Sequence, residues 1–208
     1  MPTLTRTEVE VRSSHLRAFR LDGTRVALVP EQAVLLAGDH VEVQVRVGAG
    51  RALEIVEPGG TVAYAMRGAS ASWEVTVEVE DGGSLVWHGE PFVVAQGADV
   101  RRHLRMEVGA TSRVVLRETL VLGRSGEGPG RLVSRTDVRR DAAPVLVEEL
   151  DAGVGLGSHR VLDQMLCLGT GCAGEGLVLE SGDRLHRWLG AETHASAISV
   201  CQSSPSEE

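Results

Sequence analysis

Apolar and polar residues alternate along residues 41–47, and the same arrangement returns three more times along the chain. In the first copy, residues 41–58, four valines alternate with polar residues, Gly48-Ala49-Gly50 interrupts them, and alternation resumes at Leu53 and Ile55. A period of two is typical of a half-buried strand. Further copies occupy residues 73–91, residues 103–118 and, more faintly, residues 132–149.

The copies recur at a nearly constant interval. The last residues before the turns are Val47, Val79, Val108 and Val138, which are 32, 29 and 30 positions apart. Such a period indicates one supersecondary unit stacked on copies of itself, although chance alternation in a valine-rich chain is the alternative. Glycine and aspartate fill the turns, where hairpins often need positive φ. We therefore predict a mainly β fold of stacked β-hairpins, resembling a β-helix or solenoid.

The C-terminal part has a different pattern, which predicts one or two short helices. Ser158 caps the first and Gly169 follows it, while Asp183 caps the second and Gly190 closes it. The apolar faces would hold Val161, Leu162, Met165 and Leu166 in the first helix, and Leu185, Trp188 and Leu189 in the second. We expect one domain over residues 1–190 and a polar, flexible tail over residues 191–208.

Composition narrows the class of protein. The net charge of -8 argues against a nucleic-acid partner, which needs a basic face. We expect no membrane association, because no stretch approaches ~18 uninterrupted apolar residues. The N-terminus lacks the apolar run of a secretory signal, and the three cysteines are an odd number. These features predict a cytoplasmic protein with reduced thiols.

Two other functional classes stay open at this point. Cys167 and Cys172 lie near His159, His186 and His194 in sequence, which would suit a Cys/His metalloenzyme. A closed zinc site wants tighter, paired spacing, so buried thiols and solvated histidines are favoured. The second class is a β-rich interaction module without a metal role, against which the six aromatic residues argue. The sequence has no nucleophile motif, P-loop or HExxH helix.

Several carboxylates keep the parity of core residues. Glu57, Glu118 and Glu149 each follow two apolar residues of the same parity, and in the second copy Gly89 takes this place with Glu90 after it, as a bulge allows. Carboxylates at equivalent heights in a stack would line a hydrated passage for a divalent cation. The alternative, that these glutamates lie where strands emerge into water, is favoured.

Three motifs in order resemble the urease accessory protein UreD (UreH) family. Ala37-Gly38-Asp39 with VEVQVRVGAGRALEIVEPGGTVAY resembles the family's GGD, strand, GA-turn, strand opening. LVWHGEPFVVAQGADVRRHLRMEVGA resembles its acidic, proline-bearing segment, and Leu122-Gly123-Arg124 with Gly126-Glu127 is similar to its GR-x-x-GE loop. The likeness covers about residues 34–166. It departs at Ala37, and at Thr61-Val62-Ala63-Tyr64, which lacks the family's lysine.

The resemblance implies a non-catalytic urease maturation factor with a stacked-strand fold. Its partners would be the urease apoprotein, UreF and, through UreF, the GTPase UreG, and the complex could be a homodimer. No cofactor would be tightly bound, but nickel would pass transiently through an internal path. The residues expected to contact nickel weakly are Asp39, Glu57, His88, Glu90 and Glu118.

Overall fold

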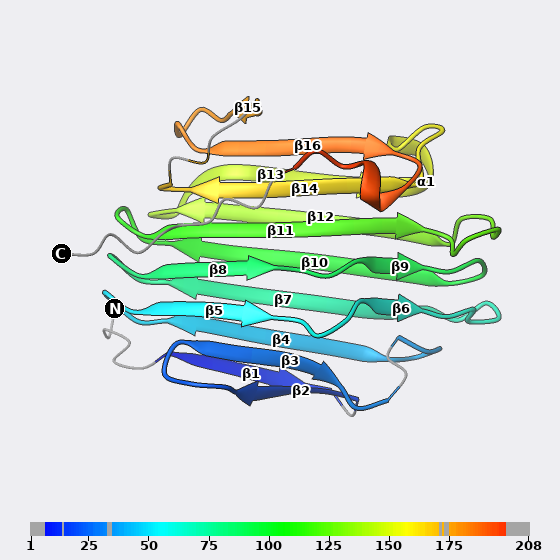
Figure 1. Ribbon diagram of the computed structural model, residues 1–208, viewed down its shortest axis with the longest axis horizontal. Helices are drawn as coiled ribbons and strands as arrows, with labels where there is room; N and C mark the ends of the chain where they lie inside the picture. The colour runs from blue at the N-terminus through cyan, green and yellow to red at the C-terminus, as the bar shows by residue number, and fades with distance from the viewer. Residues whose placement is uncertain (1–6, 14, 33–34, 171, 173–174, 199–208) are drawn as a thin grey trace.

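Two β-sheets lie face to face and form a solenoid-like stack in the computed structural model (Figure 1). The structure describes residues 7–13, 15–32, 35–170, 172 and 175–198. The first sheet, sheet A, has the strand order β1 (Glu8–Arg12), β4 (His40–Val47), β7 (Ala71–Val79), β10 (Asp99–Val108), β12 (Arg131–Arg140) and β13 (Ala143–Asp151).

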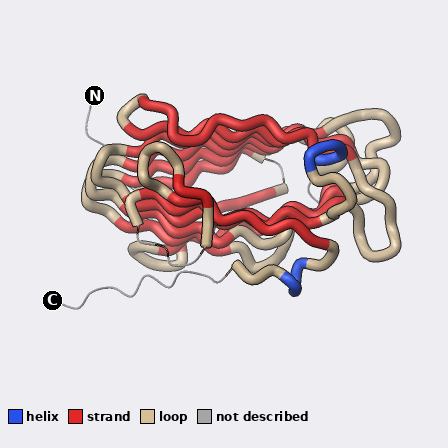
Figure 2. Tube along the Cα trace, turned by 90° about the horizontal axis from the view of Figure 1, so that it is seen from above, coloured by secondary structure: helices blue, strands red, loops and turns tan. Residues whose placement is uncertain are grey.

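Sheet B packs opposite sheet A, and Figure 2 shows the two sheets from above as two layers of strands. Its order is β15 (Leu177–Val178), β16 (Arg184–Gly190), β14 (Val161–Leu168), β11 (Arg113–Leu122), β8 (Ser84–His88), β5 (Ala52–Val56), β3 (Arg25–Pro30) and β2 (Leu16–Arg20). Two short strands, β6 (Thr61–Ala63) and β9 (Phe92–Val94), extend the sheet beside β11.

Parallel pairing in register confirms the predicted stack for the first three repeats. In sheet A, Val47 pairs with Val79 and Val79 with Val108. In sheet B, β5 pairs with β8 and β8 with β11, again in parallel. Alternate residues of each strand are buried between the sheets, as in β4, where Val41, Val43, Val45 and Val47 are all at most 1% exposed. The period of two therefore produces one continuous apolar interior.

The first three repeats differ from hairpins in how their strands pair. The strands before and after each turn belong to different sheets, as β4 in sheet A and β5 in sheet B do, so each turn is an arch that leads from one sheet to the other. The fourth repeat is a true hairpin, because β12 and β13 pair antiparallel within sheet A. Here Val108 pairs with Arg140 rather than with Val138.

The prediction that Glu149 faces the core is wrong. Glu149 pairs with Arg135 and is exposed, whereas its neighbour Glu148 pairs with the buried Thr136. The register shifts between Val138 and Arg139. That irregularity and the antiparallel return of β13 place Val147, Glu149 and Asp151 outside, which the alternation alone did not reveal.

Both predicted C-terminal helices are wrong, because residues 161–168 and 184–190 form β14 and β16. All eight residues of β14 are buried, and the strand pairs with β11 and β16 on its two sides. A continuous apolar run cannot be assigned to helix or strand by periodicity. The helical pieces are α1 (Ala152–Gly155) and the 3-10 turn η1 (Thr193–Ala195).

The cysteine prediction is also wrong for two of the three residues. Cys167, the penultimate residue of β14, forms a disulfide with Cys172, and the two Cα atoms are 6.2 Å apart. Gly169, at φ +62°, turns the chain directly after β14 and brings Cys172 back beside the strand. Cys201 lies outside the described residues.

The first part of the predicted tail lies on the outer face of sheet B. Ser196 donates a hydrogen bond to Asp163, and Ile198 packs against Val115 and Met165. Residues 199–208 are outside the described part. Within the described ranges, we find no helix with the length and apolarity needed to cross a bilayer.

Candidate functional site

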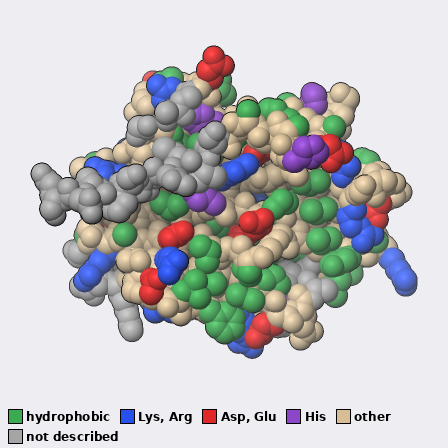
Figure 3. Space-filling view, in the orientation of Figure 1, with side chains coloured by type: hydrophobic (Ala, Val, Ile, Leu, Met, Phe, Trp, Pro, Cys, Tyr) green, Lys and Arg blue, Asp and Glu red, His purple; other side chains and the backbone are tan. Residues whose placement is uncertain are grey.

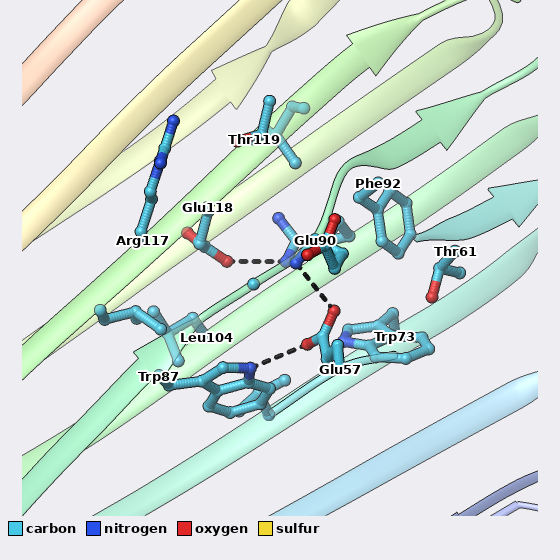
Figure 4. Close-up of a pocket in the computed structure, with 15 residues that line it drawn as sticks. Glu57, Thr61, Trp73, Trp87, Glu90, Phe92, Leu104, Arg117, Glu118 and Thr119 are labelled. Carbon is cyan, nitrogen blue, oxygen red and sulfur yellow. Dashed lines mark hydrogen bonds and ion pairs between the residues drawn. The ribbon is translucent and has the colours of Figure 1, made fainter. Parts of the chain in front are cut away.

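A cavity of about 40 Å³ lies between the sheets at the level of β5, β8 and β11 (Figure 4). Three of the predicted cation-contacting residues, Glu57, Glu90 and Glu118, line it, together with Trp73, Trp87 and Phe92. Since one water molecule needs roughly 10–15 Å³ in this measure, the cavity has room for water. The structure therefore brings these three glutamates to one partly polar interior space.

Glu57 follows β5 and is held by two hydrogen-bond donors. The Trp87 indole donates to its Oε1 at 2.8 Å and the backbone N–H of Glu90 donates to Oε2 at 3.0 Å. Burial raises the pKa of Glu57, while these hydrogen bonds and the charge of Arg102 oppose the shift. Glu57 is therefore a carboxyl group whose ionised form is costly at this position.

Arg102 reaches the cavity from the opposite sheet and forms an ion pair with Glu118. Its Nη2 lies 2.7 Å from Glu118 Oε1, and the two side chains are 10% and 14% exposed. The guanidinium also lies over the Phe92 ring, 4.7 Å from its centroid. Its buried Nε has no hydrogen-bond partner among the described residues. Arginine thus supplies the positive charge beside these carboxylates.

Polar contacts continue from Glu118 towards the C-terminal end of the stack. Gln164 donates to Glu118 Oε2 at 3.1 Å and accepts from Arg187 Nε at 3.0 Å. Arg187 in turn donates from Nη1 to Glu148 Oε2 at 2.7 Å. The chain Arg102–Glu118–Gln164–Arg187–Glu148, which we call the interior polar chain, therefore runs through β10, β11, β14, β16 and β13.

The other two predicted residues, Asp39 and His88, do not line this cavity. Asp39 Oδ2 accepts from the backbone N–H of Leu36 at 2.9 Å, in the turn that precedes β4. His88 alternates with the cavity-lining Trp87 along β8 and so points to the outer face of sheet B. Burial and the neighbouring Arg117 lower the pKa of His88.

Cysteine and histidine do not assemble the alternative metal site. Cys167 and Cys172 are bonded to each other, and His186 Nδ1 lies 2.8 Å from the carbonyl oxygen of Glu175. Throughout the ranges that the structure covers, no group of three or more His, Cys, Asp or Glu side chains is arranged to hold a metal ion. Among the interior carboxylates, Glu118 is ion-paired with Arg102, whereas Glu57 is held by the Trp87 indole and the backbone N–H of Glu90.

Residue parity along the sequence identifies Glu57 and Glu118 as cavity residues but does not identify Arg102, Gln164, Arg187 and Glu148. Arg102 could have been found, because it shares the parity of the core residues Leu104 and Met106. Gln164 and Arg187 were hidden by the helix assignment. Glu148 was hidden by the bulge in the fourth repeat.

The GR-x-x-GE segment forms a compact loop after β11. Glu127 accepts from Arg124 Nε at 2.9 Å, and Arg160 donates to the carbonyl oxygen of Gly123 at 2.5 Å. The hydrogen bond from Arg124 lowers the pKa of Glu127 to about 2. This segment therefore acts as an ion-paired turn.

Comparison with known proteins shows which family this sequence resembles. The model of the UreD urease accessory protein family matches residues 3–204. Urease accessory protein UreD 1 of Streptomyces griseus is 44% identical over 158 residues, which make up 72% of this chain and 62% of that relative. Urease accessory protein UreD 2 of Saccharopolyspora erythraea is 35% identical over 166 residues, 73% of this chain and 58% of the relative. The chain thus spans less than two thirds of the length of these relatives, and it belongs to the UreD urease accessory protein family.

Proposed function

We propose that this protein is a urease maturation factor that performs no reaction of its own. In this proposal it holds the urease apoprotein and UreF, which recruits UreG, in the cytoplasm while nickel is inserted into urease. The observation that supports a role in transfer is the interior polar chain, which links the cavity beside Glu57 to the Glu148–Arg187 pair at the C-terminal end of the stack. Family membership supports the connection with urease.

Nickel would pass as a cargo ion and would compete with arginine for the carboxylates. Arg102 occupies the cationic place beside Glu118, at 2.7 Å. A divalent ion entering the cavity would contact Glu57, Glu90 and Glu118 only if Arg102 moved away from Glu118, and the Phe92 ring offers the guanidinium a second contact. The affinity would be low, because Glu57 and Glu118 already have partners.

The experiment is a paired substitution with a matched control. Glu57→Gln with Glu118→Gln removes two interior carboxylates, whereas Glu74→Gln with Glu78→Gln removes two from the outer face of sheet A. We expect the interior pair to lower the nickel content and activity of urease matured in cells, and the outer pair to leave both unchanged. Co-purification with UreF and the apoprotein should survive in both. Wild-type nickel content with the interior pair would end the transfer proposal.

A further inference from the structure

Apolar side chains, interrupted by Arg17, Arg25 and Glu54, lie on the outer face of sheet B on the side of the N-terminal strands. Register places Phe19, Ala27 and Val56 in one outward row across β2, β3 and β5, and Val62 and Val93 in another across β6 and β9. In Figure 3, hydrophobic side chains gather over these strands in the lower and right parts of the view. We call Phe19, Val29, Val56, Val62, Val86 and Val93 the valine face.

The chain itself covers the neighbouring part of the same face. Beyond β8, the outward residues Val115 and Met165 pack with Ile198, and outward Asp163 bonds to Ser196. Residues 191–198 therefore form a ridge along β11 and β14, with the valine face beside it. In the described part of the chain, the five valines of that face stay partly exposed and Phe19 is 46% exposed. A sheet face of this kind is normally buried against another layer.

The size of the valine face decides between two occupants. Its five valines are only partly exposed and Phe19 is 46% exposed, so it offers no more than the low end of the roughly 300–600 Å² of the largest patch on a typical monomer. A standard interface buries about 800 Å² on each partner, which is more than this face provides to a second copy laid flat on it. A single helix needs less contact area than a second copy. A helix lying across the strands would span three strand spacings of about 4.8 Å with about ten residues, at a rise of 1.5 Å per residue.

The backbone also favours a helix over an added strand. The strands under the valine face are paired on both sides within sheet B, apart from β2 at its edge and the outer side of β6. A segment lying on this face finds few free backbone groups, so it must satisfy its own hydrogen bonds, as a helix does. A helix beside the ridge would contact both the valines and residues 191–198.

We infer that the valine face docks the apolar stripe of an amphipathic α-helix from a partner protein of the maturation complex. The inference rests on the proposed function for the identity of that complex. The surface itself is separate from the interior cavity, because it lies on the opposite side of sheet B.

The test replaces valines of this face by arginine and compares them with a control on the other sheet. Val56→Arg and Val93→Arg place a charge on the valine face, and Val133→Arg does so at a half-buried outward position of β12. Binding to purified UreF and to the urease apoprotein is measured for each variant after circular dichroism confirms its fold. We expect at least a tenfold loss of affinity for one partner with both valine-face variants, and wild-type affinity with Val133→Arg.

A photocrosslinking amino acid at positions 56 and 93 tests the helix directly and does not depend on tolerating arginine. Crosslinked partner residues three or four positions apart would support the inference, whereas alternate residues would indicate a strand and overturn it. Crosslinks to a second copy would also overturn it. Normal binding by the arginine variants rejects the docking face alone. A wild-type chain that binds neither partner rejects the proposed function, and the docking inference with it.

Discussion

The strands up to β10 and the strands from β11 onward bury different chemistry. In the described part of the chain, every buried polar or charged residue lies at or after Ser112; these are Ser112, Thr119, Ser134, Thr136, Asp163, Gln164, Asp183 and His186. The earlier strands bury valine, leucine, isoleucine, methionine and tryptophan. The strands up to β10, the early coils of the stack, therefore depend mainly on the pattern of apolar residues, with Glu57 and Arg102 at the cavity as exceptions. The later strands need particular partners for particular side chains.

Asp163 illustrates the second kind of packing. Its carboxylate accepts from Arg117 Nε at 3.0 Å and Nη2 at 2.7 Å, from Thr119 Oγ1 at 3.1 Å and from Ser196 Oγ at 2.5 Å. Burial raises the pKa of Asp163, but the hydrogen bonds from Arg117 and Ser196 outweigh it and leave the pKa lowered. This group joins β11, β14 and the ridge.

The largest predicted effect is the loss of this buried charge. Asp163→Asn keeps the shape of the side chain but leaves Arg117 without its carboxylate, and Asp163 is 0% exposed. Removing one member of a buried pair costs about 3–5 kcal/mol of unfolding free energy. Urea denaturation should show this loss.

An exposed pair provides the matched control. Asp99 and Arg131 lie 3.3 Å apart with side chains 34% and 54% exposed, so Asp99→Asn should cost less than about 1 kcal/mol. Equal losses of unfolding free energy for Asp99→Asn and Asp163→Asn would show that burial does not make the Arg117–Asp163 pair more important for stability than the exposed pair.

The early coils should respond to volume instead. Leu85 in β8 is 1% exposed among apolar neighbours, so Leu85→Ala should cost about 2–5 kcal/mol, whereas Leu85→Met should cost less than about 1.5 kcal/mol. The shape-conserving change is thus mild at Leu85 and severe at Asp163. Urea denaturation of Leu85→Ala, Leu85→Met and Asp163→Asn under the same conditions tests this contrast. A loss of stability in Leu85→Met as large as that in Asp163→Asn would contradict it.

The same contrast explains what the sequence could predict. Val47, Val79 and Val108 fell into register because a period of two and a constant interval directly encode parallel stacking. Residues 161–168 could not be assigned, since a strand buried on both faces loses its alternation. At the cavity, Glu57 and Glu118 followed from parity. Their pairing with Trp87 and Arg102 depends on contacts between strands distant in sequence, which no local pattern contains.

Glu57 is an ionisable group within the early coils, and its pH dependence gives a smaller test. Burial raises the pKa of Glu57 above 4.5 in the folded protein. The contribution of this group to folding stability is therefore complete below its pKa in the unfolded chain, and it is lost as the pH rises through its pKa in the folded protein. Glutamine does not titrate. The stability of Glu57→Gln relative to the wild type should therefore improve steadily from pH 4 to pH 7 in urea titrations. Parallel pH curves for the two proteins would contradict the raised pKa.

The turns give the smallest and most direct comparison of the two regions. Gly82, at φ +70°, lies in the arch after β7, while Ala142, at φ +63°, follows Asp141, at φ +48°, in the β12–β13 hairpin. An added Cβ at Gly82 meets backbone atoms only at 3.6 Å, so the cost of Gly82→Ala comes from its φ. Gly82→Ala should lose about 0.5–1 kcal/mol and Ala142→Gly should gain a similar amount. Shifts of the urea midpoint in opposite directions would show that the hairpin retains strain that the arch avoids, whereas a loss in both variants would mean that Ala142 is supported by its surroundings.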